Sequence, residues 1–206
     1  MRKATRVVAA LLGVFAGFGG PEHGYFEILQ GNVRPASLMF PAMGPPCEPA
    51  QVWNACEPAV TLFPSLLMAG ILATVVGLLT MIWAAAFIHR KNGGIVLMLL
   101  CIALLLVGGG VVPPVIGLIA GAVATKIHAP LHGRPGGVSR FLAGLWPWPL
   151  VLFFIWAFGE FLVGYTFNEF LLQNGFLILI LLPGLLVLSI VSGSARDLED
   201  APGAGD

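Results

Sequence analysis

The sequence predicts an all-α membrane protein, a polytopic bundle of about six transmembrane helices. Of its 206 residues, 58% are hydrophobic and only 10% are charged, against a charged share of about 25% in soluble domains. The apolar residues form runs long enough to cross a bilayer, which takes roughly 20 residues in a helix. The ten basic and ten acidic residues leave no net charge, so we expect no nucleic-acid partner.

The apolar runs give the predicted spans in order. These are residues 7–29, 60–88, 94–109, 113–127, 141–164 and 167–192. The first follows a basic start and contains Pro21, so it predicts one kinked helix. A cleaved signal peptide ending at Val14-Phe15-Ala16 is the alternative, because basic and apolar regions come in the same order there.

The third and fourth spans come from one apolar stretch, residues 94–126. A single helix of this length would measure about 50 Å, far more than the roughly 30 Å hydrocarbon core. Its middle reads Gly108-Gly109-Gly110-Val111-Val112-Pro113-Pro114. Glycine just past a helix end and proline at the start of the next predict a helical hairpin that turns here.

The distribution of basic residues favours two crossings in this stretch, because Lys and Arg of short loops prefer the cytoplasm. With both termini cytoplasmic and two crossings, nine basic residues are cytoplasmic and only Arg34 is external. With one crossing the split is five to five. A re-entrant loop gives the same sides as two full spans and stays open.

The last two spans are separated by a predicted tight turn at residues 164–167. Thr166 and Glu169 have the spacing of a capping box, which predicts a helix start there. Trp146 and Trp148 fit an aromatic belt at the cytoplasmic interface. We expect residues 1–192 to form a single transmembrane domain with an external loop at 31–58, and the acidic residues 193–206 to be a disordered tail.

Several polar groups lie where lipid should discourage them. His23, Glu27 and Gln30 are spaced as one stripe of the first helix. Beside this stripe runs a series of glycines that lets a neighbouring helix approach closely. The series is Gly13, Gly17, Gly20 and Gly24. The stripe should therefore face the bundle, as a wet cluster at the helix end, as an ion, proton or substrate site, or as a metal site.

Two more acids complete the candidate site. Glu22 precedes the histidine, and Glu160 lies about 28 Å along the fifth span. The predicted topology places both towards the same outer side as Glu27. Convergence of all these groups in one site is allowed, and solvation of Glu160 near the helix end is an equal alternative.

The external loop carries Cys47 and Cys56, each within a Cys-Glu-Pro-Ala sequence. Outside the cytoplasm a structural disulfide is the first expectation for such a pair. Cys101, in the third span, is typical of a small apolar filler. We predict no metal centre and no cofactor.

A basic loop follows the fourth span. Lys126, Arg134 and Arg140 suggest contact with anionic lipid. His128 and His132 are four residues apart there, but Pro130 argues against the regular helix that a metal pair would need. We place the protein in a prokaryotic plasma (inner) membrane.

Three functions remain open. A small-solute or ion transporter or channel is favoured by the acid–histidine cluster and the interrupted third and fourth spans. A non-catalytic structural or assembly partner, forming homo- or hetero-oligomers, suits the glycine-rich faces and short loops. An intramembrane enzyme acting on a lipid or quinone is least favoured, because the chain contains no phosphate-binding loop, zinc-protease or serine-hydrolase motif.

Overall fold

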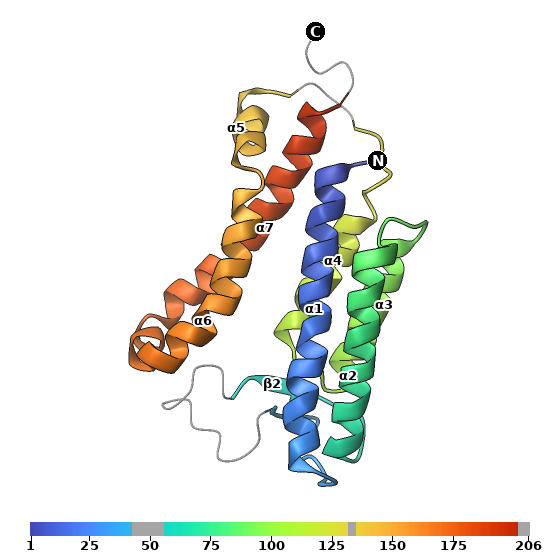
Figure 1. The fold of residues 1–206 in the computed structure, drawn as a ribbon, viewed down its shortest axis with the longest axis vertical. Coiled ribbons are helices and arrows are strands. Elements are labelled where there is room, and N and C mark those ends of the chain that lie inside the picture. The colour runs from blue at the N-terminus through green and yellow to red at the C-terminus, as the bar shows by residue number, and fades with distance from the viewer. Residues whose placement is uncertain (43–55, 132–134, 202–206) are drawn as a thin grey trace. The chain divides into compact units, whose positions relative to one another are not determined.

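The computed structural model describes residues 1–42, 56–131 and 135–201. These form seven α helices and a two-stranded sheet (Figure 1). In chain order the elements are α1 Lys3–Gln30, β1 Met39–Pro41, β2 Pro58–Val60, α2 Leu66–Ile82, a π-helical turn Trp83–Phe87, α3 Gly93–Leu106, α4 Val112–Ala124, α5 Gly137–Leu145, α6 Trp148–Gln173 and α7 Gly175–Glu199. The all-helical fold class is confirmed.

The chain separates into two compact units, each described by itself. The four-helix unit comprises residues 9–49 and 54–125, and so holds most of α1 together with β1, β2 and α2 to α4. The C-terminal unit comprises residues 126–206 together with residues 1–8 and 50–53.

Glycines hold α1 and α2 together in the four-helix unit, as the glycine series predicts. A Cβ on Gly17 would lie 2.7 Å from the carbonyl oxygen of Gly77, and one on Gly70 would lie 2.6 Å from that of Gly24. The two backbones therefore touch, and no larger residue fits between them. This close approach turns the polar stripe of α1 towards the bundle.

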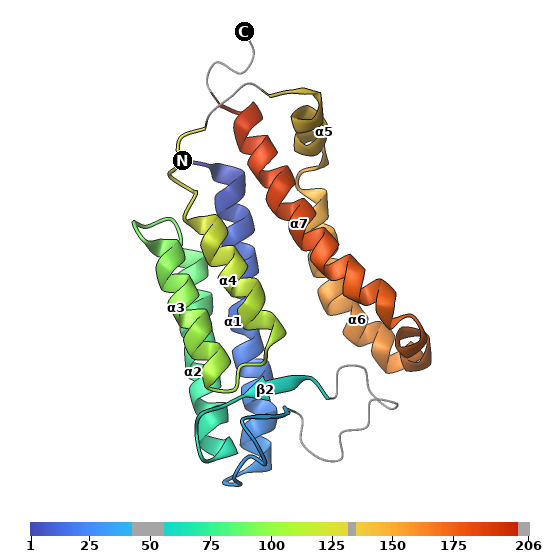
Figure 2. The same ribbon diagram turned by 180° about the vertical axis from the view of Figure 1, so that it is seen from behind.

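The predicted break in residues 94–126 is confirmed. α3 ends at Leu106, α4 begins at Val112, and the two helices pack side by side as a hairpin (Figure 2). Gly108 and Gly110 in the turn have φ values of +109° and +77°, which side chains rarely tolerate. At 14 and 13 residues, the helices measure about 21 and 20 Å, shorter than a bilayer core.

The segment between α1 and α2 contains a small sheet that the sequence pattern does not predict. Strands β1 and β2 pair antiparallel, with Phe40 opposite Ala59. The chain after β2 continues the pairing against the α3–α4 turn: Thr61 bridges Val107, and the Leu62 amide donates to Leu106 O at 3.1 Å. Figure 2 shows β2 lying beside that turn. We call the two paired segments, residues 38–42 and 57–62, the flap.

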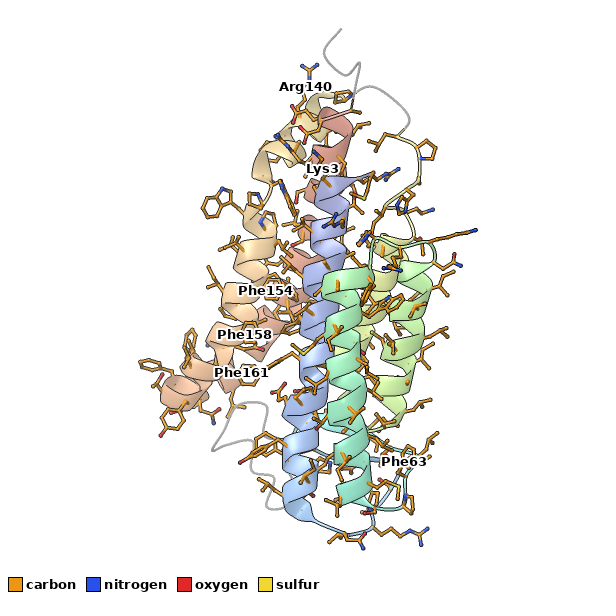
Figure 3. The ribbon with its side chains drawn as sticks, turned by 45° about the vertical axis from the view of Figure 1, so that its right-hand side comes forward. Lys3, Phe63, Arg140, Phe154, Phe158 and Phe161 are labelled. Atoms are coloured by element: carbon orange, nitrogen blue, oxygen red, sulfur yellow. The ribbon has the colours of Figure 1, made fainter. Side chains whose placement is uncertain are left out.

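The flap also corrects the start of the second span, which was predicted at residue 60. α2 begins six residues later, at Leu66, because Pro58–Val60 is a strand. Pro64 precedes the helix, and Ser65 at its start has extended backbone angles. Phe63, labelled in Figure 3, packs against the buried cluster of Ala73, Leu104 and Val107.

In the C-terminal unit the fifth predicted span, 141–164, is wrong at its start. Its first residues belong to the separate short helix α5, and the long helix α6 begins at Trp148. Figure 3 shows Phe154, Phe158 and Phe161 along α6, where the rings of Phe154 and Phe158 stack with centroids 6.2 Å apart.

The turn predicted at 164–167 falls on a kink: α6 comprises two helical segments that meet at Phe167, and the second segment continues to Gln173. At the kink, Phe167 has non-helical angles of −133° and 45°. The Thr166 hydroxyl donates to Leu162 O at 3.1 Å instead of capping a new helix. The helix ends where the Asn174 side chain donates to Phe170 O at 2.8 Å and Gly175 begins α7.

The last helix extends seven residues beyond the predicted boundary at 192, so residues 193–199 are helical rather than part of a tail. Two interactions explain the extension. Arg196 pairs with Asp200 at 3.1 Å, and the buried Asp197 accepts hydrogen bonds from the amides of Ala4 and Thr5, both at 2.8 Å. The remainder of the predicted tail, residues 202–206, lies outside the described residues.

Within the described residues, four helices are long and apolar enough to cross a membrane: Lys3–Gln30, Leu66–Phe87, Trp148–Gln173 and Ile180–Glu199. In α6 only 28% of the most apolar window is buried within the protein. A helix that is apolar on its exposed faces needs lipid or protein around it. Hence the structure has the character of a membrane protein.

Candidate functional site

The last turns of α1 carry a carboxyl group that is completely enclosed. Glu27 has an exposed fraction of 0%. Within the described part of the chain, neither of its carboxyl oxygens has a hydrogen-bond partner. Buried polar groups normally have partners, and leaving an ionised carboxylate buried without one costs several kcal/mol. Glu27 is therefore the group in the four-helix unit that most needs a functional explanation.

The turn between α3 and α4 closes against Glu27. A Cβ on Gly108 would lie 2.5 Å from both Glu27 oxygens. Only glycine leaves room for the carboxyl group here, and the φ of +109° independently requires glycine. The two features that the sequence analysis treated separately, the acid–histidine stripe and the broken helix pair, thus meet at one place.

His23 lies one helical turn before Glu27 and is almost as deeply buried, with 3% exposed. Its ring packs against Gly110 of the same turn. Neither ring nitrogen has a hydrogen-bond partner among the described residues. The Nε2 atom lies 3.8 Å from Oε2 of Glu57.

Glu57 is the site residue that the sequence analysis missed. It immediately precedes β2, and its carbonyl oxygen accepts a hydrogen bond of 3.0 Å from the Ala42 amide. The strand pairing therefore fixes the position from which its side chain reaches His23. Its side chain is 18% exposed, so Glu57 is the member of the group that is open to solvent. The sequence Cys56-Glu57-Pro58 shows an acidic residue beside a cysteine, but no local pattern there predicts that this residue lies near α1.

Gln30 is placed differently from the rest of the predicted stripe. Its side-chain amide donates to Ala42 O at 2.8 Å and to Phe26 O at 3.3 Å. Gln30 therefore fastens the flap to the end of α1, and its amide donors are used there. Glu22 is half-buried on the same helix.

Glu160 is buried in α6, with 8% exposed. It belongs to the C-terminal unit, so its predicted grouping with the acids of α1 stays a prediction. Lys126 and Arg140 are exposed in the same unit, where Figure 3 labels Arg140. Arg134, the third residue of the predicted lipid contact, lies outside the described residues.

The cysteines take no part in the site as described. Cys47 lies outside the described residues, so its predicted disulfide with Cys56 stays a prediction. Cys101 is a free, fully buried cysteine that packs against Gly117, as predicted for an apolar filler. Across residues 1–42, 56–131 and 135–201, no three His, Cys, Asp or Glu side chains form a group able to hold a metal ion.

The arrangement has a definite chemical character. Two carboxyl groups and one imidazole gather around a glycine turn. The facing helix α2 and the turn 107–111 contain no titratable side chain, and Arg34, on the loop after α1, is exposed. Among the described residues, neither Glu27 oxygen has a hydrogen-bond partner, so the site favours a proton or another cation over an anion.

Comparison with known proteins adds no family assignment. No family model, no curated protein and no solved structure matches this chain. The function is therefore argued from the site alone.

Proposed function

We propose that this chain is a multi-pass membrane protein that moves a small solute or ion across the bilayer, using the site around Glu27 and His23. The observation that carries the proposal is the fully buried Glu27, unpartnered within the described residues and enclosed by the broken α3–α4 hairpin. Ionisable groups at membrane depth are usually functional.

In the proposed topology both termini are cytoplasmic, and α1, α2, α6 and α7 cross the bilayer. The helices α3 and α4, counted as two of the six predicted spans, enter from the inner side as a short hairpin. Two contacts within the C-terminal unit support it. Arg2 donates its amide hydrogen to Ile127 O at 2.9 Å, and Asp197 accepts from Ala4 and Thr5. The segments before α1, after α4 and near the end of α7 therefore lie together, as an even number of crossings between them requires. The location in a prokaryotic plasma membrane stays a prediction.

The short hairpin supports a site below the outer membrane surface. Because α3 and α4 are each roughly 10 Å shorter than the bilayer core, a hairpin that starts at the inner surface turns within the outer part of the core. The flap bonds to this turn. In this topology the flap separates Glu27 from the external solution.

The test is flux through purified protein in liposomes. Imposed proton, Na⁺ and K⁺ gradients should dissipate faster with the wild-type protein than in empty liposomes. The Glu27→Gln variant should lose this activity. Glu169→Gln makes the same chemical change at an exposed position of α6 and should keep it. Equal flux with wild type and empty liposomes for every cation would contradict transport of these ions, and equal flux with wild type and Glu27→Gln would contradict the role of the site.

The alternative is an assembly partner without transport activity. The observation that favours it is the end of α6, where large apolar side chains are strongly exposed. These are Leu162 at 76%, Tyr165 at 85%, Phe167 at 64% and Phe170 at 56%. Lipid or a partner helix would cover them equally well. Cross-linking in native membranes separates the two, since an assembly partner must give a defined heteromeric product.

A further inference from the structure

We propose that the ion bound at this site is a proton held by the Glu27 carboxyl group, and that His23 and Glu57 form its path to the external surface. This inference rests on the proposed function, because it names the ion that the site handles. It also assigns a role to Glu57. Three independent features carry it: the surroundings of Glu27, the lack of space around its carboxyl group, and the order of exposure along the three side chains.

The surroundings of Glu27 favour the neutral, protonated carboxyl group over the charged carboxylate. In the described part of the chain, the titratable groups that approach each other here are His23 on α1 and Glu57 beside β2. The helix α2 and the 107–111 turn supply no charged side chain. A carboxylate in this position gains too little from one imidazole to offset the loss of water, whereas a bound proton removes the charge at the site itself.

The space around Glu27 suits a proton better than a larger solute. The Gly108 backbone is so close that even a methyl group would collide with both carboxyl oxygens, and Gly110 closes in the same way on the His23 ring. A solute of several heavy atoms has to displace the whole turn. A proton adds no heavy atom and fits the site as it stands.

The exposed fraction of the side chain increases from Glu27 to His23 to Glu57, as expected for a path from the buried acid to solvent. Glu27 is 0% exposed, His23 is 3% exposed, and the Glu57 side chain is 18% exposed. His23 and Glu27 share one helix face because they are four residues apart, but no hydrogen bond joins them among the described residues, so this link also requires a side-chain rotation. The His23–Glu57 separation of 3.8 Å is beyond hydrogen-bond length, so a small rotation of either side chain, or one water molecule, must complete the link.

The proton transfer balances at each stage. Glu57 takes a proton from external water and passes it to Nε2 of His23, which becomes imidazolium while Glu57 returns to carboxylate. The imidazolium releases the proton on its Nδ1 to Glu27 and becomes neutral again. Imidazole suits this role because its two nitrogens accept and donate near neutral pH. Reversal returns the proton to the outside.

Infrared spectroscopy of the purified full-length protein in lipid tests the proposal without requiring transport. A protonated carboxylic acid gives a carbonyl band that shifts when D₂O replaces water. We expect a buried band that is lost in Glu27→Gln, kept at a shifted position in Glu27→Asp, and unchanged in the control Glu169→Gln. Persistence of the band in Glu27→Gln would overturn the proposal.

The path is tested by the rate at which that band exchanges with deuterium. Glu57→Gln and His23→Gln should keep the band but slow its exchange by about a hundredfold, since a positioned proton carrier commonly gives that factor or more. Deuterium exchange at the wild-type rate in both variants would contradict the proposed proton path. Deuterium exchange of the band needs no ion gradient, so the two proposals can fail separately. Normal exchange without any liposome flux would contradict the transport function alone. Liposome flux without an infrared band from Glu27 would contradict the proton-binding role alone.

Discussion

The backbone of Gly108 lies against the carboxyl group of Glu27, so near that a Cβ at this glycine would be 2.5 Å from both carboxyl oxygens. The contact joins the last turns of α1 to a turn about 80 residues later in the chain. The Glu27 carboxyl group is the far end of a flexible side chain, whereas the turn is bonded to the flap, so a Cβ at Gly108 would displace the carboxyl group before the turn. The contact thus ties the position of the turn to the state of the acid.

Replacing Gly108 by alanine should therefore destabilise the protein and disturb the site. The φ of +109° costs a non-glycine residue about 1–3 kcal/mol, and the clash adds to it. Thermal unfolding in detergent should begin at a lower temperature than in wild type. Gly159→Ala in α6, where a Cβ meets nothing within 4 Å, is the matched control and should unfold at or above the wild-type temperature. An unfolding temperature equal to wild type in Gly108→Ala would contradict the contact.

Replacing Asp197 by alanine should loosen the start of α1. Its carboxylate caps the amides of Ala4 and Thr5, and loss of a helix cap costs about 0.5–2 kcal/mol. Amide hydrogen exchange at Ala4 and Thr5 should become faster, and thermal stability should fall. Asp200→Ala removes an acid that is exposed and pairs only at the surface with Arg196, so it should have a much smaller effect. Protection at Ala4 and Thr5 that survives in Asp197→Ala would show that another group caps this helix.

Replacing Gln30 by leucine should release the flap from α1. The lost hydrogen bond to Ala42 O contributes about 0.5–1.5 kcal/mol, which corresponds to roughly a twofold to tenfold increase in opening. Hydrogen exchange at the amides of Ala42 and Thr61, which bond within the flap, reports this opening directly. Gln173→Leu on exposed α6 is the control. Equal exchange in both variants would mean that the strand pairing alone holds the flap.

Much of the four-helix unit could be predicted from local patterns. The glycine series of α1 has the spacing of a helix face, and Gly108–Pro114 has the chemistry of a turn, so each feature is visible in a short window of sequence. His23 and Glu27 share a face for the same reason. These features depend on helix geometry alone, and helix geometry repeats regularly along the chain.

The features that could not be predicted depend on contacts between distant segments. Glu57 reaches His23 because β1 and β2 pair, and three-residue strands leave almost no pattern in the sequence. Thr166 and Glu169 have the spacing of a cap, and a kink does occur beside them at Phe167, but the Thr166 hydroxyl bonds back to Leu162 O rather than forward to a new helix. Asp197 resembles part of an acidic tail until its partners at the other end of the chain are known.

The hydrogen bonds from the Ala4 and Thr5 amides to Asp197 can form only late in biosynthesis. The ribosome makes α1 long before it reaches α7, so the first turn of α1 enters the membrane with its amides uncapped and with Arg2, Lys3 and Arg6 around it, charges that oppose the helix dipole. Asp197 neutralises this end only after some 190 further residues have been added. The amides of Ala4 and Thr5 thus gain their acceptor only after α7 has been synthesised, and a product that stops before α7 lacks this cap.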